Sequence, residues 1–179
     1  MKTKIVELGT IDDRMQVDRS YLNRMAYTEN CGAVRGDVVM VIRDADDPDI
    51  ATTHRFRNVI TNDGLALFAS AMANGISGGR TWHLVLGTGS GTPAATDTGL
   101  FTPVAGSAKT GSLSSTGSQY QYYVRYLPEE ANGYTYTEAG IYENGGYDTG
   151  PFLNHLMLSP TLEKTSDILV DFYITITFS

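Results

Sequence analysis

The segment Ile168-Leu-Val-Asp-Phe-Tyr-Ile-Thr-Ile-Thr-Phe178 decides the class of fold to which this chain belongs. Its apolar residues recur at every second position, at Ile168, Val170, Phe172, Ile174, Ile176 and Phe178. A period of two is typical of a β-strand that buries one face and turns the other to water or to a partner. We therefore predict that this strand belongs to the core of a β-rich domain.

Other segments share strand character, through alternating polarity or a short apolar run: residues 38–42, 53–60, 82–86, 120–126 and 152–158. Turn sequences separate them, at 44–49, 132–133 and 144–146. Roughly seven or eight short strands at this spacing predict a mainly β fold. We expect an antiparallel, jelly-roll-like β-sandwich with one short α-helix and an N-terminal arm, and a small β-barrel is the alternative. The arm is assigned to residues 1–35 and the β-sandwich domain to residues 36–179.

The one helix is predicted directly after residues 53–60. Asn62 is a favourable N-cap, and Asp63 places a negative charge at the positive end of the helix dipole. An apolar stripe follows at helical spacing, formed by Leu65, Phe68, Ala69 and Met72, and Asn74-Gly75 ends the helix. We expect this stripe to pack against the sheets.

Composition limits the function. The chain has 179 residues and a formal net charge of −7, and most of the acidic excess lies after residue 110, which disfavours nucleic acid as a partner. No apolar run approaches the roughly 18 residues of a membrane span, and the start of the chain is not a secretory signal. Cys31 is the only cysteine, which excludes an internal disulfide. Synthesis and assembly in a host cytoplasm are the simplest expectation.

A glycine run at Gly87, Gly89 and Gly91 invites comparison with a phosphate-binding loop. Such a loop needs a lysine and a hydroxyl residue after its last glycine, at the N-terminus of a helix. Here Thr92 and Pro93 follow Gly91, and no lysine occurs before Lys109. The nucleotide interpretation therefore fails, and the loop at 87–118 is instead a candidate for contacts between copies.

The segment Trp82-His-Leu-Val-Leu-Gly-Thr-Gly-Ser-Gly-Thr-Pro-Ala-Ala-Thr-Asp-Thr-Gly-Leu100 resembles a recurrent block in structural proteins of tailed bacteriophages. Three further segments resemble the same family in the same order: 58–65, 137–146 and 158–167, the last followed by the closing strand. Together they cover roughly residues 53–179. The resemblance implies a β-rich virion component of the tail, collar, fibre or decoration type, with no catalytic residues and no cofactor.

Other chemistry has less support. His54, His83 and His155 show no metal-like spacing, and the acidic turn at 44–49 lacks the glycine and glutamate of an EF-hand loop. Glu129, Glu130 and Glu138 could suggest a glycosidase pair, but residues 128–133 have the character of an exposed turn. No serine or cysteine stands in a nucleophile motif. We therefore predict neither an enzyme nor a metal site.

Tyrosines crowd two neighbouring strands. Tyrosine suits subunit interfaces because its ring is apolar while its hydroxyl seeks a partner. The candidate interface residues are Tyr120, Tyr122, Tyr123, Tyr126, Tyr134 and Tyr136 in the β domain and Tyr21, Leu22 and Met25 in the arm. Ordinary core packing and sugar binding are the alternatives for the tyrosines.

The function expected from these observations is that of a structural component of a tailed phage virion (tail, collar or neck, fibre or decoration protein). It would associate with itself, as a trimer or ring, and dock to other virion proteins through residues 1–35. Its location would be the virion, after assembly in the host cytoplasm, with neither nucleic acid nor membrane as a partner. The alternative is a carbohydrate- or receptor-binding module of a phage fibre that contacts a host-surface glycan.

Overall fold

The computed structural model describes residues 34–74, 81–143 and 150–178. The contacts between Cα atoms separate residues 1–33 and 179 from one compact unit, Val34–Phe178, which is the β domain. The predicted arm residues Tyr21, Leu22 and Met25, and also Cys31, lie outside the described residues. The division of the chain at residue 35 stays a prediction, although β1 already begins at Val34.

The described residues form a mainly β fold with one helix, as predicted. In chain order the elements are β1 (Val34–Asp44), β2 (Ala51–Ile60), α2 (Asn62–Asn74), β3 (Trp82–Gly87), β4 (Lys109–Thr110), β5 (Ser112–Thr116), β6 (Gln119–Tyr126), β7 (Tyr134–Glu143), β8 (Phe152–Lys164) and β9 (Ile168–Phe178). Strand β9 has the predicted bounds of the closing segment. Strands β1 and β8 are longer than the apolar runs that predicted them.

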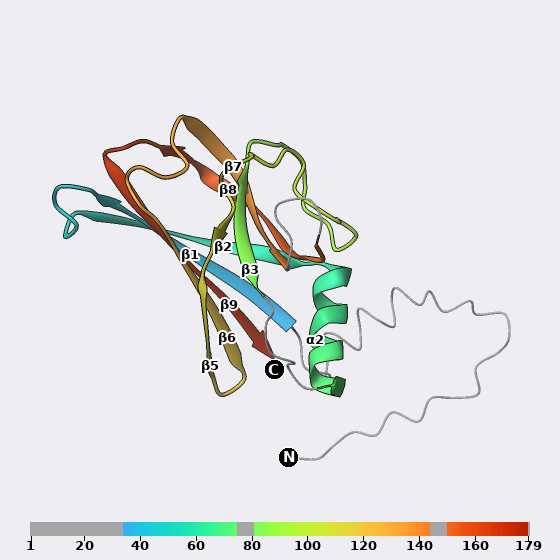
Figure 1. The fold of residues 1–179 in the computed structure, drawn as a ribbon. Coiled ribbons are helices and arrows are strands. Elements are labelled where there is room, and N and C mark those ends of the chain that lie inside the picture. Colours follow the sequence, from blue (N-terminus) through green and yellow to red (C-terminus); the bar gives the residue numbers. More distant parts are fainter. Residues whose placement is uncertain (1–33, 75–80, 144–149, 179) are drawn as a thin grey trace, which may run out of the picture. The chain divides into compact units, whose positions relative to one another are not determined.

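The strands form one antiparallel sheet in the order β4-β3-β7-β8-β2-β1-β9-β6-β5. Strand β2 joins its two halves, because it pairs with β1 along most of its length and with β8 only through Val59 and Ile60. The two halves face each other across a common core (Figure 1). The arrangement confirms the expected antiparallel β-sandwich or small barrel.

The two ends of the strand order meet through a single stretch of chain. Strand β4 pairs with β3, β5 pairs with β6, and only Gly111 separates β4 from β5. The Tyr122 hydroxyl donates to the Trp82 carbonyl, and the Tyr126 hydroxyl lies 3.1 Å from the Leu84 carbonyl. These contacts join β6 to β3, so the sheet is nearly closed into a barrel.

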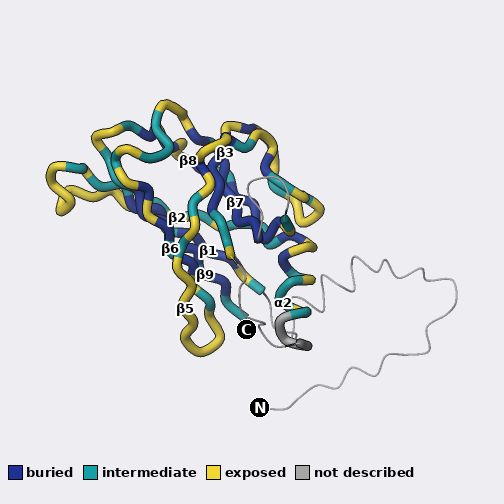
Figure 2. The backbone as a smooth tube through the Cα atoms, in the orientation of Figure 1, coloured by how far each residue is buried: buried dark blue, intermediate teal, exposed yellow. Residues whose placement is uncertain are grey.

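The core lies between the two halves. The even-numbered residues of β9 fill one side, with Val38 and Met40 of β1, and Leu84, Leu86, Ile141 and Leu156 fill the other. Figure 2 shows this buried chain along the central strands. The period-two pattern of β9 therefore identified its buried face correctly, since Val170, Phe172 and Ile174 are fully buried.

Helix α2 begins one residue earlier than the predicted cap implies. The Thr61 hydroxyl accepts a hydrogen bond from the Gly64 amide (3.1 Å) and donates to the Phe152 carbonyl, so Thr61 is the N-cap and the assignment to Asn62 is wrong. Phe68 packs edge-on against Phe178, with ring centroids 5.2 Å apart, and seats the helix on the core. Ala69, predicted in the stripe, is exposed, and Leu67 contacts the core instead.

Candidate functional site

Loop 88–108 covers the outer side of β3, β7 and β8, and it is held there by one buried carboxylate. A register shift in β7 between Tyr136 and Glu138 leaves the Tyr136 ring in the core and turns Glu138 to the opposite face, beneath the loop. Glu138 is fully buried. Its oxygens accept hydrogen bonds from three backbone amides, those of Gly89 (2.9 Å), Phe101 (2.9 Å) and Thr102 (2.7 Å).

A second buried side chain, His155 on β8, completes the network. Its Nε2 lies 2.9 Å from Glu138 Oε2, and its Nδ1 lies 2.7 Å from Asp97 Oδ2. Asp97 belongs to the loop and also accepts the Ala94 amide at 2.9 Å. We refer to Glu138, His155 and Asp97 as the Glu138 network. It ties two strands of the sheet to both ends of the loop.

The glycine run makes room for this carboxylate. A Cβ on Gly89 would lie 2.5 Å from both Glu138 Oε1 and Phe101 Cβ, and a Cβ on Gly87 would also lie 2.5 Å from Glu138 Oε1. Both approaches are closer than van der Waals contact allows. The loop thus does bind an anion through its amides, but the anion is a side chain of the same protein.

The hydrogen bonds decide the charges of the network. Burial by itself would raise the pKa of Glu138, but the bonds from His155 and from the three amides outweigh it and lower that pKa. Burial would likewise lower the pKa of His155, and the bonds to Glu138 and Asp97 raise it instead. Both ring nitrogens face carboxylates, so the imidazole is held as a cation between two anions.

This arrangement suits a structural role better than catalysis. A general base must reach the proton of a substrate with a free nitrogen or oxygen. Here both nitrogens of His155 are occupied, and its side chain is completely shielded from solvent. The network therefore fixes the conformation of a long loop, which otherwise has little regular structure.

A second buried carboxylate lies on the outer face of the other half of the sheet. Asp171 of β9 accepts hydrogen bonds from Arg125 (2.7 and 3.0 Å), Tyr123 (2.7 Å) and Arg43 (3.2 Å). Burial would raise the pKa of Asp171, but the bonds from Arg125, Tyr123 and Arg43 lower it. The carboxylate therefore orders one tyrosine and two arginines from β6 and β1, the two strands that flank β9.

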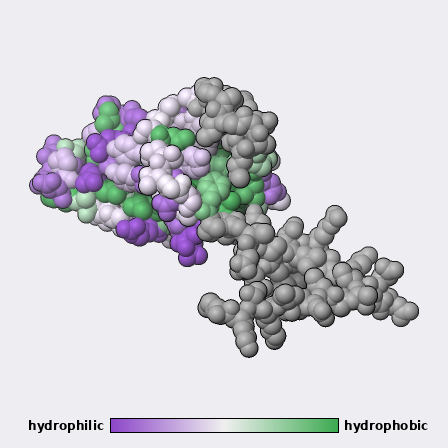
Figure 3. Space-filling model, turned by 90° about the horizontal axis from the view of Figure 1, so that it is seen from below, coloured by the Kyte–Doolittle hydropathy of each residue, from purple (hydrophilic) through white to green (hydrophobic). Residues whose placement is uncertain are grey.

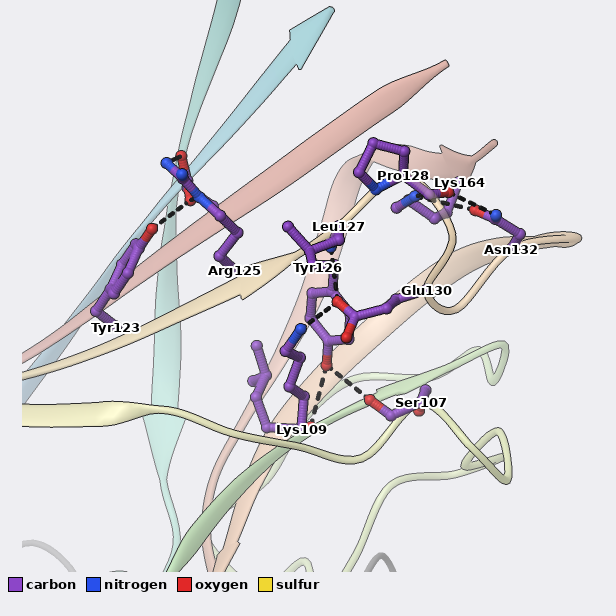
Figure 4. A network of polar contacts seen from close by, with 12 residues as sticks. Ser107, Lys109, Tyr123, Arg125, Tyr126, Leu127, Pro128, Glu130, Asn132 and Lys164 are labelled. Atoms are coloured by element: carbon purple, nitrogen blue, oxygen red, sulfur yellow. Dashed lines mark hydrogen bonds and ion pairs between the residues drawn. The ribbon is translucent and has the colours of Figure 1, made fainter. Parts of the chain in front are cut away.

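The turn between β6 and β7 holds a third polar cluster (Figure 4). The Lys164 ammonium donates to Asn132 Oδ1 (2.9 Å) and to the carbonyls of Pro128 (3.2 Å) and Thr165 (2.8 Å). Glu130 pairs with Lys109 and accepts the Leu127 amide. The carboxylates of Glu130 and Glu138, weighed above as a glycosidase pair, thus belong to separate networks of the fold.

The predicted interface tyrosines divide into two groups. Tyr122, Tyr126 and Tyr136 are buried in the core, and their hydroxyls bind backbone carbonyls, such as Ala131 for Tyr136 (2.9 Å). For these three the alternative of core packing describes the structure, because a buried ring has no surface for a partner. Tyr120 and Tyr123 are half-buried, and Tyr134 is 48% exposed.

The remaining candidates lie apart. His83 Nδ1 contacts the Thr110 hydroxyl on β4 (3.1 Å), His54 lies on β2, and His155 belongs to the Glu138 network. In the acidic turn, Asp44 Oδ1 accepts the amides of Asp46 and Asp47. Within the described part of the chain, no group of three or more histidine, cysteine or acidic side chains could hold a metal ion. None of the described helices is long and apolar enough to cross a bilayer.

Sequence reasoning did not identify the Glu138 network. In the sequence, His155 is one of three scattered histidines, and Glu138 is one member of a possible acid pair. The signals were nevertheless inside the segments quoted for the phage resemblance, in Thr96-Asp-Thr98 and Thr137-Glu-Ala139.

In comparisons with family models, curated proteins and solved structures, nothing matches this chain.

Proposed function

We propose that the protein is a structural component of a tailed phage virion, which acts by associating with itself and by docking to other virion proteins. The supporting observation is that three of the four segments of the phage resemblance meet at one place in the fold. Gly89 and Asp97 come from the first segment, and Glu138 comes from the segment at 137–146. The segment at 58–65 joins them, because the Asn62 amide donates to the Ala95 carbonyl (2.7 Å).

This convergence supports the resemblance because the separate motifs contribute to one structural feature, the anchor of loop 88–108. The glycine Gly89, the aspartate Asp97 and the glutamate Glu138 are far apart in the sequence, and the fold brings them together as a single loop anchor. The anchor itself binds its own chain, so the proposed activity belongs to the surfaces that the anchored loop and the sheets present. We therefore propose assembly, with no reaction to catalyse, as that activity.

A second candidate is a carbohydrate- or receptor-binding module, and Tyr134 is the observation that favours it. Its exposed ring lies beside Tyr136, with centroids 5.8 Å apart, directly after the Asn132-Gly133 turn. The Asn132 side chain, however, is already bonded to the Pro128 carbonyl and to Lys164. One exposed tyrosine is a small platform for a sugar, so we rank this function second.

The first test is the native mass of the full chain by multi-angle light scattering, repeated on a variant that lacks residues 1–33. The deletion stops at 33 because Val34 already pairs with Phe178. We expect a trimer or larger ring that survives the deletion. Oligomers lost with the deletion would assign assembly to residues 1–33, and monomers in both forms would contradict the proposal.

A glycan array probed with the full chain separates the two candidate functions. Binding that the Tyr134→Ala variant abolishes, in a monomeric protein, would replace the assembly proposal by the receptor-binding one. Mass spectrometry of purified phage particles, which should contain the chain at many copies, tests the virion location directly.

A further inference from the structure

The arginines of the β domain are concentrated on one face of the sheet. Cross-strand pairs in an antiparallel sheet share a face, so the register of β1, β2, β9 and β6 identifies the outer residues. That face carries five arginines, Arg35, Arg43, Arg55, Arg57 and Arg125, against the acidic residues Asp37 and Asp171. We call it the arginine face. The arginine face is basic, although the formal net charge of the whole chain is −7.

Part of the arginine face is unpaired, and part is held in place. Arg55 and Arg57 are exposed and have no ion pair among the described residues. Arg43 and Arg125 are instead bonded to the buried Asp171 carboxylate. Ordered side chains lose less conformational freedom on binding than free ones.

Aromatic rings lie in the middle of the same face. Tyr123 of β6 and Tyr173 of β9 are directly paired across the strands, with ring centroids 5.0 Å apart. Val39 of β1 pairs with Tyr173 on the other side. Tyrosine and arginine around a small apolar centre are the residue types that contribute most of the binding energy at protein interfaces.

The complementary charge lies at the tip of the β1–β2 hairpin. Asp44, Asp46, Asp47 and Asp49 are all exposed there, and Ile50 beside them is 63% exposed. Hydrophilic residues gather at the end of the β domain that carries this hairpin (Figure 3). We call residues 44–50 the acidic tip.

The acidic tip contacts Arg43 at the edge of the arginine face, but it is unable to reach Arg55 and Arg57 of its own molecule. The tip ends the same two strands whose middle carries Arg55 and Arg57, and it is held by Arg43, whose Nη1 donates to the Pro48 carbonyl (3.1 Å). Folding the tip back would require breaking the β1–β2 pairing. Only another molecule can place such a tip on Arg55 and Arg57.

We propose that the arginine face binds the acidic tip of a second copy of this chain. Such a contact joins two different surfaces of identical chains, so it builds rings or filaments when it runs in one direction, and a two-fold dimer when two molecules exchange tips. The inference rests on the proposed function, since it names the surfaces through which the protein associates with itself. Ile50 would lie against the Tyr123–Tyr173 pair, and the aspartates against Arg55 and Arg57.

Two charge-reversal variants of the full chain test the proposal. Arg55→Glu/Arg57→Glu alters the face, and Asp46→Lys/Asp49→Lys alters the tip while sparing Asp44 and Asp47, whose carboxylates accept backbone amides of the turn. Sedimentation velocity over a range of protein and salt concentrations measures association. We expect each variant alone to associate roughly 100-fold more weakly, because like charges then face each other.

Mixing the two variants supplies the decisive result. The lysine tip of one variant matches the glutamate face of the other, and the remaining tip and face are unchanged, so a one-to-one mixture should recover association, with the two variants alternating. Glu129→Lys, at an exposed position of the β6–β7 turn that belongs to neither surface, is the control and should leave association unchanged. Urea unfolding of each variant checks that the fold is intact.

Each other outcome has a distinct meaning. If both variants assemble as wild type does, the arginine face is not the interface and the inference fails, while the proposed function stands. If each variant loses assembly but the mixture stays dissociated, the face does not bind the acidic tip and the inference also fails. A wild-type chain that is monomeric under all conditions would contradict the proposed self-association itself.

Discussion

The carboxylate of Glu138 is enclosed entirely by donors of its own chain. An ionised group in a protein interior is tolerated only when charge and hydrogen bonds compensate its lost hydration. Three amides and one imidazolium supply that compensation here. The same bonds hold the loop, together with the bond from the Leu100 amide to the Tyr142 hydroxyl and the bond from the Thr137 hydroxyl to the Gly89 carbonyl, so its conformation depends strongly on β7.

Glu138→Gln should therefore destabilise the protein strongly. The side-chain amide of glutamine would place N–H donors opposite the loop amides, which are donors themselves. His155 would also lose one of the two carboxylates that it contacts. We expect the free energy of unfolding in urea to fall by about 3–5 kcal/mol, the range for breaking a buried ion pair. Glu129→Gln, at an exposed position of the β6–β7 turn, is the control. An unchanged urea midpoint for Glu138→Gln would refute the role of the network.

The same residues predict how stability depends on pH. The pKa of Glu138 is lowered from 4.5, so its contribution is present above pH 4.5 and lost as the pH falls through the lowered value. The pKa of His155 is raised from 6.5, so its contribution is present below pH 6.5 and lost as the pH rises through the raised value. Urea unfolding should thus show greatest stability between pH 4.5 and 6.5.

His155→Gln isolates the alkaline side of this profile. Without the imidazolium, the decline in stability above pH 6.5 should disappear, while the decline in acid remains because Asp171 also has a lowered pKa. An alkaline decline of equal size in the variant would mean that another group causes it.

At the scale of elements, Gly111 is the point where one stretch of chain changes its partner strand. A Cβ at this position would lie 2.3 Å from the Tyr123 carbonyl oxygen, and the Gly111 amide donates to the Tyr122 hydroxyl (2.6 Å). The backbone must therefore pass very close to β6. This passage lets β4 and β5 bring the two ends of the sheet together.

Gly111→Ala should accordingly weaken the junction between β3 and β6. The methyl group meets backbone, which moves less readily than a side chain, and we expect a loss of about 1–3 kcal/mol in thermal or urea unfolding. Ser112→Ala, at the adjacent exposed position, should have little effect. Equal stabilities for the two variants would show that the close approach relaxes without cost.

At the scale of the whole molecule, charge is distributed unevenly. The arginine face offers positive charge to a partner molecule, and the acidic tip offers negative charge to another. The Glu138 network uses buried charge to hold the fold itself. The net charge of −7 therefore says little about any one surface. Salt should weaken association between copies more than it weakens the buried networks, because buried pairs are screened less.

The β domain should fold without the first 33 residues. The hydrophobic core and all three polar networks described above are built from residues of Val34–Phe178. We expect the variant lacking residues 1–33 to keep the β-type circular dichroism spectrum and the melting temperature of the full chain. A large fall in melting temperature would show that those residues complete the core.

The sequence by itself determined β9, the approximate positions of β1, β2, β3, β6 and β8, the position of the helix and the buried face of β9, because these follow from periodicity over neighbouring residues. It also distinguished the glycine run from a nucleotide site, since that requires only the residues that follow it. Only the tertiary structure decided that Thr61 caps the helix, that Tyr122, Tyr126 and Tyr136 are core residues, and that Glu138, His155 and Asp97 meet. Each of these depends on which strands pair and in what register, and a shift of one residue exchanges the two faces of a strand. Contacts between distant segments have no local periodicity, so no short stretch of sequence contains them.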